Sequence, residues 1–145
     1  MVIVMVKILL RLLPFIYMVA IWVMSSMPDN AVVELPDSKW DSGIKESLHL
    51  VEFGILYVLL VFALLTFKGL TKKRNIVLMI IASLYGITDE IHQSFVPYRS
   101  ATMIDVVKDI TGVLVASWIM YGAYHKKRFL KLGRVLRKLE STSTL

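Results

Sequence analysis

Acidic side chains stand where an apolar segment of the chain comes to its end. The stretch YGITDEIHQSFVPYR, residues 85–99, places Asp89 and Glu90 after a long apolar run, and Gln93 and Arg99 follow them. An ionised Asp at the centre of a membrane helix costs roughly 2.5–3.5 kcal/mol on insertion scales. A carboxyl group kept there can serve as a general acid or base, and an arginine can hold a phosphate or carboxylate through paired hydrogen bonds. The stretch therefore indicates a site for an anionic substrate.

Two other apolar segments carry polar residues at helical spacing. Lys45, His49 and Glu52 follow one another at intervals of four and three residues, and Asp105 precedes Asp109 by four. Residues three, four or seven positions apart share one face of a helix. Each set therefore forms a polar stripe on a predicted helix that is otherwise apolar.

The composition is that of a membrane protein. Hydrophobic residues make up 57% of the 145 residues, and the mean hydropathy is +0.67. A helix that crosses ~30 Å of hydrocarbon needs about 20 residues. Four apolar runs meet this length: Ile8–Met24, Ser47–Phe67, Ile76–Phe95 and Met103–Tyr124. We therefore expect an all-α membrane protein, a bundle of four transmembrane helices in one domain (residues 1–125), followed by a basic tail (residues 126–145).

Lys and Arg are distributed unevenly between these runs. The connection KGLTKKRN, residues 68–75, and the tail are basic, whereas the first connection holds one lysine and four acids. Connections rich in Lys and Arg remain in the cytoplasm during membrane insertion. We therefore predict a multi-pass protein of the cell membrane, with both termini cytoplasmic and with the first and third connections extracytoplasmic.

Both ends of the chain allow a second interpretation. The first run could be a signal peptide that begins at Lys7 and Arg11, but the following SSMP is a poor cleavage site, so we expect the run to be retained. Apolar residues of the tail recur at helical spacing between basic ones: Phe129, Leu132, Leu136 and Leu139. The tail is therefore expected to be either an amphipathic helix on anionic lipid or a plain cytoplasmic anchor.

The predicted directions of the helices bring the polar residues to one membrane face. Glu52 lies near the start of an inward-running helix, Asp89 near the end of an outward-running one, and Asp105 at the start of the next. A shared polar pocket open to the outside follows from this arrangement. In an alternative, purely structural interpretation, ions such as Lys45 and Glu52 pair only to hold the helices together. The surplus of acids over cations favours a functional site.

Side-chain chemistry suggests roles within the expected pocket. His49 is the candidate general base, oriented by a carboxylate such as Glu52, and Asp89 or Glu90 is the candidate general acid. The candidate catalytic residues are His49, Glu52, Asp89, Glu90 and Asp105. The candidate substrate-binding residues are Ser25, Ser26, Lys45, Gln93, Arg99 and Asp109. No nucleophile is evident, because the two serines at the end of the first run have the position of helix-terminal or turn residues.

These residues are also those by which the chain resembles the VanZ-like family, which is named for its link to resistance to the glycopeptide antibiotic teicoplanin. The shared motifs are Ser25, Ser26 and Pro28; Lys45, His49 and Phe53; Asp89, Glu90, Gln93, Phe95, Pro97 and Arg99; and Asp105 with Gly112. The family pattern has Asn at the position of Asp109, so this chain has one more acid there. The resemblance implies a membrane location, a role in the cell envelope and an influence on glycopeptide sensitivity.

Three classes of function remain open. The first is a membrane enzyme or binding protein for an anionic, lipid-linked precursor of the cell envelope. The second is a small transporter or proton-coupled carrier, although the inner halves of the runs offer almost no polar path. The third is a membrane scaffold that recruits envelope proteins through the acidic first connection, around Glu34 and Asp37.

We expect neither a resident cofactor nor a metal. The chain has no cysteine, which excludes a thiolate site. A divalent metal stays an alternative, because His49 with Glu52, and Asp89 with His92, present ligand types three residues apart on two predicted helices. The expected partners are the lipid bilayer and an envelope substrate. No soluble basic patch with interleaved aromatic residues indicates nucleic acid, and the sequence leaves the oligomeric state open.

Overall fold

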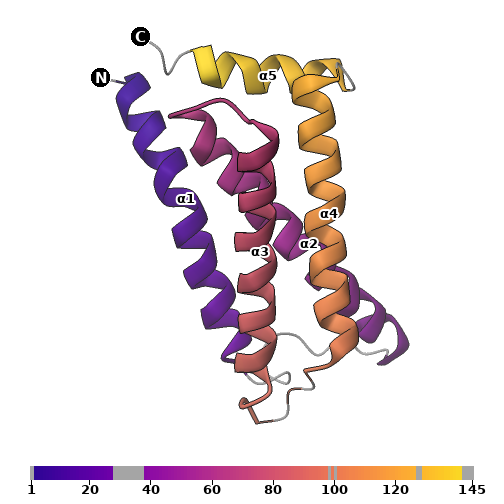
Figure 1. The fold of residues 1–145 in the computed structure, drawn as a ribbon. Helices are drawn as coiled ribbons and strands as arrows, with labels where there is room; N and C mark the ends of the chain where they lie inside the picture. Colours follow the sequence, from indigo (N-terminus) through magenta and orange to yellow (C-terminus); the bar gives the residue numbers. More distant parts are fainter. Residues whose placement is uncertain (1, 28–37, 98, 100, 127–128, 142–145) are drawn as a thin grey trace.

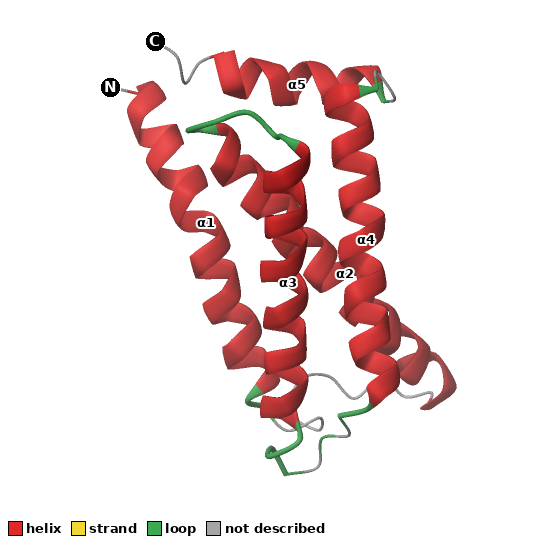
Figure 2. Ribbon diagram, viewed as in Figure 1, coloured by secondary structure: helices red, strands yellow, loops and turns green. Residues whose placement is uncertain are grey.

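A computed structural model provides the structure of the chain. It describes the backbone of residues 2–27, 38–97, 99, 101–126 and 129–141, and the side chains of residues 3–27, 50–97, 99, 101–126 and 129–141. Within these ranges the regular elements are helices and no strand occurs, as Figure 2 shows. The helices are α1 (Val2–Ser25), α2 (Ser38–Leu65), α3 (Lys72–Gln93), α4 (Met103–His125) and α5 (Leu130–Ser141). The all-α prediction is therefore confirmed for the described residues.

The first four helices correspond to the four predicted apolar runs, of which the second and third extend two residues past the ends of α2 and α3. α2 begins at Ser38, well before the predicted start at Ser47, because a search for apolar runs passes over the polar first turns of a helix. Threonine hydroxyls begin the next two helices: the backbone N–H of Arg74 donates to Thr71, and that of Asp105 donates to Thr102, at 3.3 Å each. Such side-chain acceptors satisfy N–H groups that have no partner within the helix.

α2 is the central helix of the bundle. Its fully buried side chains are Phe53, Leu56, Tyr57, Val61 and Leu65. Buried residues from every other helix join them in one core: Ile21 of α1, Ala82 of α3, Val113 and Met120 of α4, and Leu136 of α5. Figure 1 shows α2 passing behind α3 and α4, and α2 contacts each of the other described helices. The residues that α2 carries are consequently the best placed to meet side chains from several helices.

Small residues let α2 and α4 approach closely where they cross. A Cβ atom added to Gly112 would collide with the backbone carbonyl oxygen of Leu50, and one added to Gly54 would lie 3.2 Å from the carbonyl oxygen of Gly112. Two backbones can come this near only where no side chain lies between them, and providing such a place is the usual role of glycine in membrane helix pairs. This crossing lies one turn from Asp109 and thereby sets the position of that acid relative to α2.

The two ends of the bundle differ in charge. In Figure 1 the start of α1, the helix α5 and the connection between α2 and α3 lie at one end, whereas α1 and α3 finish, and α4 begins, at the other. We name the first the basic end, for Lys7, Arg11, Lys68, Lys72, Lys73, Arg74 and the cations of α5. We name the second the acidic end, for Asp89, Glu90, Asp105 and Asp109. The fold thus gathers at one end all the described segments that the orientation prediction assigns to the cytoplasm.

α5 lies across the basic end and packs on it. Leu136 is fully buried, and Leu132 and Leu139 pack against the same core. Arg137 Nη1 donates to the carbonyl oxygen of Tyr124 at 3.1 Å, and the Tyr124 hydroxyl donates to Glu140 at 2.5 Å. The apolar face predicted for the tail is therefore largely occupied by the bundle itself.

The outward faces of the long helices are apolar. Large exposed hydrophobic residues include Phe15 and Val19 of α1, Ile80 and Leu84 of α3, and Leu114 and Trp118 of α4. Exposed apolar surface on this scale marks a binding or membrane-contacting face. Of the helices searched over the described residues, α1 is long and apolar enough to cross a membrane, and Leu50–Leu65 of α2 forms a shorter apolar stretch. In α3 and α4, acidic residues interrupt the apolar length.

The glycine crossing generates a stability prediction. Gly112→Ala should destabilise the bundle by about 1–3 kcal/mol, because the new methyl group meets a rigid backbone carbonyl rather than a movable side chain. Unfolding of the purified protein by increasing SDS in mixed micelles, followed by circular dichroism, measures the change. Val115→Ala on the exposed face of the same helix is the matched control. A Gly112→Ala protein as stable as the native chain would show that the helices do not approach as described.

Candidate functional site

The acids of α3 are buried near the end of that helix. Asp89 is 1% exposed, Glu90 4% and Gln93 3%. Gln93 Nε2 donates to Asp89 Oδ2 at 2.7 Å, so the amide lies one turn beyond the carboxyl group on the same face of the helix. The other carboxylate oxygen of Asp89 is buried without a hydrogen-bond partner in the described part of the chain. Burying an unpaired carboxylate oxygen costs free energy, and an apolar side chain would fill the same space without that cost.

Asp109 of α4 lies against α3 directly over Gly86. It is fully buried, and a Cβ atom added to Gly86 would lie 3.2 Å from Cβ and 3.4 Å from Oδ2 of Asp109. The same Cβ would be 3.4 Å from the ring of Phe53 on α2. Glycine at position 86 thus leaves the space in which the extra acid of α4 and a core residue of α2 meet α3.

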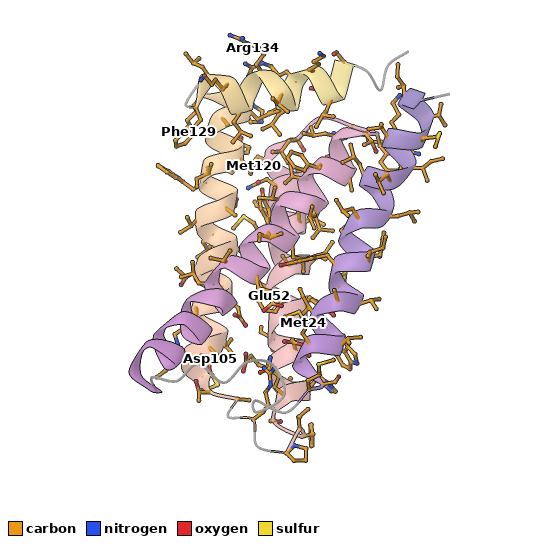
Figure 3. The ribbon with its side chains drawn as sticks, turned by 180° about the vertical axis from the view of Figure 1, so that it is seen from behind. Met24, Glu52, Asp105, Met120, Phe129 and Arg134 are labelled. Atoms are coloured by element: carbon orange, nitrogen blue, oxygen red, sulfur yellow. The ribbon has the colours of Figure 1, made fainter. Side chains whose placement is uncertain are left out.

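Glu52 supplies a carboxyl group from the central helix. Its side chain is half-buried, and in Figure 3 it lies within the bundle near the level of Met24, the residue close to the end of α1. The carboxyl group interacts electrostatically with Asp89 and with Arg99. Asp109 in turn has four acidic neighbours that act on it electrostatically: Glu52, Asp89, Glu90 and Asp105. These five residues, from three helices, form the acid cluster.

Arg99 joins the acid cluster to the end of α1. Its Nη1 donates to Gln93 Oε1 at 3.0 Å, and Gln93 passes the connection on to Asp89. Its Nη2 and Nε donate to the carbonyl oxygens of Met24 and Met27, at 3.0 and 3.1 Å. The guanidinium therefore contacts backbone carbonyl groups at and just beyond the C-terminus of α1, where the Met24 carbonyl oxygen also accepts from the backbone N–H of Met27. Arg99 reaches Asp89 through Gln93 rather than by direct contact.

Asp105 lies at the margin of the cluster, at the beginning of α4. Thr102 Oγ1 donates to Asp105 Oδ2 at 2.6 Å, and Lys108 Nζ forms an ion pair with Asp105 Oδ1 at 3.2 Å. These contacts identify Asp105 as part of the cap of α4, in addition to its electrostatic interaction with Glu90. Figure 3 shows it at the end of the helix, below Glu52 in that view.

The two serines at the end of α1 differ in their surroundings. Ser25 is buried, and its hydroxyl donates to the carbonyl oxygen of Trp22 at 3.1 Å. Ser26 is exposed; its hydroxyl lies 2.6 Å from the same carbonyl oxygen and 2.9 Å from Nε2 of His92. The imidazole of His92 also stacks on Trp22, with ring centroids 4.0 Å apart. Neither serine therefore touches the acid cluster through a described hydrogen bond.

His92 is the neighbour that the sequence prediction considered only as a metal ligand. Its contacts with Ser26 and Trp22 direct it toward α1, away from the face of α3 that carries Asp89 and Gln93. No group of three or more His, Cys, Asp or Glu in the described ranges is arranged to hold a metal ion. The histidine within the stretch DEIHQ was the one sign in the sequence of this contact. Its partner Ser26 lies at the end of another helix and could not be identified from residue spacing.

The expected members Lys45 and His49 belong to the first turns of α2, whose side chains lie outside the described residues. Their place in the pocket stays a prediction. Among the other expected members, the structure brings Glu52, Asp89, Glu90 and Asp109 together with Gln93, and places Arg99 and Asp105 at the edge of that group. Asp89, Glu90 and Asp109 are nearly inaccessible, so a ligand would approach through the half-buried Glu52, Arg99 and Asp105.

A second buried polar group lies nearer the basic end. The Tyr57 hydroxyl donates to Asn75 Oδ1, Asn75 Nδ2 donates to Ser117 Oγ at 2.9 Å, and the Ser117 hydroxyl lies 3.0 Å from the sulfur of Met79. Tyr57 and Ser117 belong to the inner halves of the runs, where the sequence offers almost no polar path, and the structure joins them through Asn75 at the start of α3. Tyr57 and Ser117 have apolar neighbours in sequence, and Asn75 follows a run of basic residues, so their convergence was not visible from spacing.

Comparison with known proteins identifies the family. A family model described as VanZ/LLP1 matches residues 3–125, which is most of the chain, and the chain therefore belongs to the VanZ/LLP1 family. The matched region contains every residue of the acid cluster and ends before α5. No curated protein and no solved structure gives a significant match.

The Tyr57–Asn75–Ser117 group generates a second stability prediction. Asn75→Leu keeps the volume but leaves the Tyr57 and Ser117 hydroxyls without their buried partner, which should cost about 1–2 kcal/mol. Thr88→Val is the control, because the exposed Thr88 hydroxyl donates to a carbonyl oxygen of its own helix. SDS-induced unfolding of both variants measures the difference. Equal stability would mean that the three residues do not join α2, α3 and α4.

Proposed function

We propose that this member of the VanZ/LLP1 family is a multi-pass membrane protein that binds, and through its carboxyl groups acts on, an anionic lipid-linked substrate of the cell envelope. The observation that carries the proposal is the acid cluster: buried carboxyl groups from α3 and α4 lie with the half-buried Glu52 of α2 at one end of an apolar bundle. Ionisable residues kept inside a membrane bundle are costly and generally mark a functional site. The family resemblance to proteins linked with teicoplanin resistance supports an influence on glycopeptide sensitivity.

Four membrane-spanning helices are proposed for α1 to α4. The apolar outward faces of α1, α3 and α4 support this, because they can contact lipid while the polar residues stay inside. The gathering of basic residues at the end that holds the start of α1 and the helix α5 supports a cytoplasmic location for that end. Residues 1–125 would then form the membrane domain, and residues 126–145 a cytoplasmic tail whose cations face the anionic leaflet.

The acidic end would face outward and receive the substrate. Arg99 provides positive charge at the edge of the acid cluster, next to the end of α1, where an anionic headgroup could approach. The half-buried Glu52 is more accessible than the buried Asp89, Glu90 and Asp109, and would exchange a proton with the bound group. The buried Asp89, held by Gln93, would fix the electrostatic environment of that exchange.

A second candidate function is a proton-coupled carrier. The buried Tyr57–Asn75–Ser117 group supports it, because it adds polar atoms between the acid cluster and the basic end. A relay from Asp109 to Tyr57 would have to pass the packed glycine crossing and the core residue Val113. The first proposal needs no such path and is therefore preferred.

Charge-neutralising variants test the proposed site. Asp89→Asn keeps the size and can still accept the hydrogen bond from Gln93, and Arg99→Lys keeps the charge but loses the planar fork. We expect each to reduce teicoplanin tolerance of an expressing strain to that of a strain without the protein, at unchanged protein abundance. The measurement is the minimum inhibitory concentration beside a membrane immunoblot.

Glu140→Gln is the matched control, because it neutralises a half-buried acid at the basic end, where Glu140 accepts from Tyr124. It should leave the tolerance unchanged. If Asp89→Asn and Arg99→Lys are abundant and fully active, the acid cluster is structural. If they are active while Glu34→Gln and Asp37→Asn are not, the protein is a scaffold that acts through its first connection.

A further inference from the structure

Ser26 and His92 form a polar pair outside the acid cluster. The Ser26 hydroxyl is exposed and lies 2.9 Å from His92 Nε2, a distance at which a serine can pass its proton to an imidazole. The hydroxyl also lies 2.6 Å from the carbonyl oxygen of Trp22. A serine has one proton to donate, so rotation of the hydroxyl from the carbonyl to Nε2 converts the histidine from a hydrogen-bond neighbour into a general base.

The Trp22 ring supports that role of the histidine. It stacks on the imidazole with an interplanar angle of 18°. An indole face attracts a cation, so the stack can stabilise the positive charge that the imidazole acquires when it takes the proton. Arg99, which bonds to the carbonyl oxygens of Met24 and Met27, fixes the backbone on both sides of Ser26. The pair is thus held by contacts from α1, from α3 and from the segment after α3.

An apolar groove lies beside this pair and shares Trp22 with it. It lies between α1 and α3, has a volume of about 340 Å³, and is lined by Phe15, Met18, Val19, Trp22 and Tyr85. The Tyr85 hydroxyl donates to the carbonyl oxygen of Met18 at 2.7 Å, which holds the two helices at this separation. Trp22 belongs both to the groove and to the stack on His92. A hydrocarbon chain lying in the groove would therefore contact Trp22, whose carbonyl oxygen lies 2.6 Å from the Ser26 hydroxyl.

We propose that Ser26 and His92 are the nucleophile and general base of an esterase site for membrane lipids, and that the groove between α1 and α3 holds the acyl chain of the ester. The site is separate from the acid cluster, so this activity does not depend on the function proposed for that cluster. It assigns a role to Ser26, which makes no described hydrogen bond to the acid cluster.

The reaction is an ordinary ester hydrolysis in two steps. Ser26 Oγ attacks the ester carbonyl carbon while His92 Nε2 takes the hydroxyl proton; the ester C–O bond then breaks, and the leaving oxygen takes this proton as an alcohol. Water attacks the acyl-serine and gives one proton to His92. The carboxylic acid leaves, and the proton returns to Ser26 Oγ.

An alkyl fluorophosphonate tests the pair directly, because it reacts with an activated serine by forming an O–P bond and losing fluoride. The purified full-length chain in dodecyl maltoside should acquire one adduct, located at Ser26 by mass spectrometry of its peptides. His92→Gln keeps a hydrogen-bonding side chain but cannot take a proton, and should slow labelling about 100-fold or more. Ser26→Ala should abolish it.

Ser94→Ala is the matched control, because Ser94 is an exposed serine at the end of α3 whose hydroxyl bonds only to a helix carbonyl oxygen. It should label as the native chain does. Absence of an adduct on the native chain, an adduct at Ser25 instead, or equal labelling of His92→Gln would each overturn the proposal. The native chain alone decides the first two outcomes, so a variant that fails to fold does not obscure them.

Chain length tests the groove. Val19→Trp places a large side chain in it on the lipid-exposed face of α1. Hydrolysis of p-nitrophenyl laurate should slow at least about tenfold more than that of p-nitrophenyl acetate, because only the longer ester needs the groove. An equal effect on both esters would show that the acyl chain lies elsewhere.

Discussion

Buried carboxyl groups are the constraint on which the rest of this structure depends. Asp89 and Asp109 are almost completely removed from solvent, and Glu90 is close to them. Groups of one charge type cannot be collected in an apolar bundle unless neighbouring helices provide space, dipoles and compensating charge. Gly86 provides the space for Asp109, Gln93 provides the amide for Asp89, and Arg99 provides positive charge at the edge.

The two halves of the bundle are held together in different ways. At the acidic end, glycines bring α2, α3 and α4 close enough for their acids to act on one another. Toward the basic end, Tyr57, Asn75 and Ser117 join the same three helices by neutral hydrogen bonds, without a charge that must be compensated. One half is therefore suited to chemistry and the other to stability. α1 packs beside this unit and leaves a groove against α3 whose lining includes Trp22, the ring that stacks on His92.

The helices and the acid cluster could be predicted from the sequence, because both follow from periodicity. Apolar runs located α1 to α4, and the spacing of Asp89 and Gln93, and of Asp105 and Asp109, assigned them to helix faces. Contacts that depend on the rotation of one helix against another could not be predicted. The pairing of His92 with Ser26, and the convergence of Tyr57 and Asn75, are of this kind. Arg99 was expected to bind an anion, but it also donates to the backbone carbonyl oxygens of Met24 and Met27 near the end of α1.

The central claim, that the acidic end faces out of the cell, is tested most directly by labelling single cysteines in this cysteine-free chain. Lys73 and Ser94 are exposed residues at opposite ends of α3. In intact cells, Ser94→Cys should react with a membrane-impermeant maleimide, and Lys73→Cys should react only after the membrane is permeabilised. Labelling of Lys73→Cys in intact cells, with Ser94→Cys protected, would contradict the account.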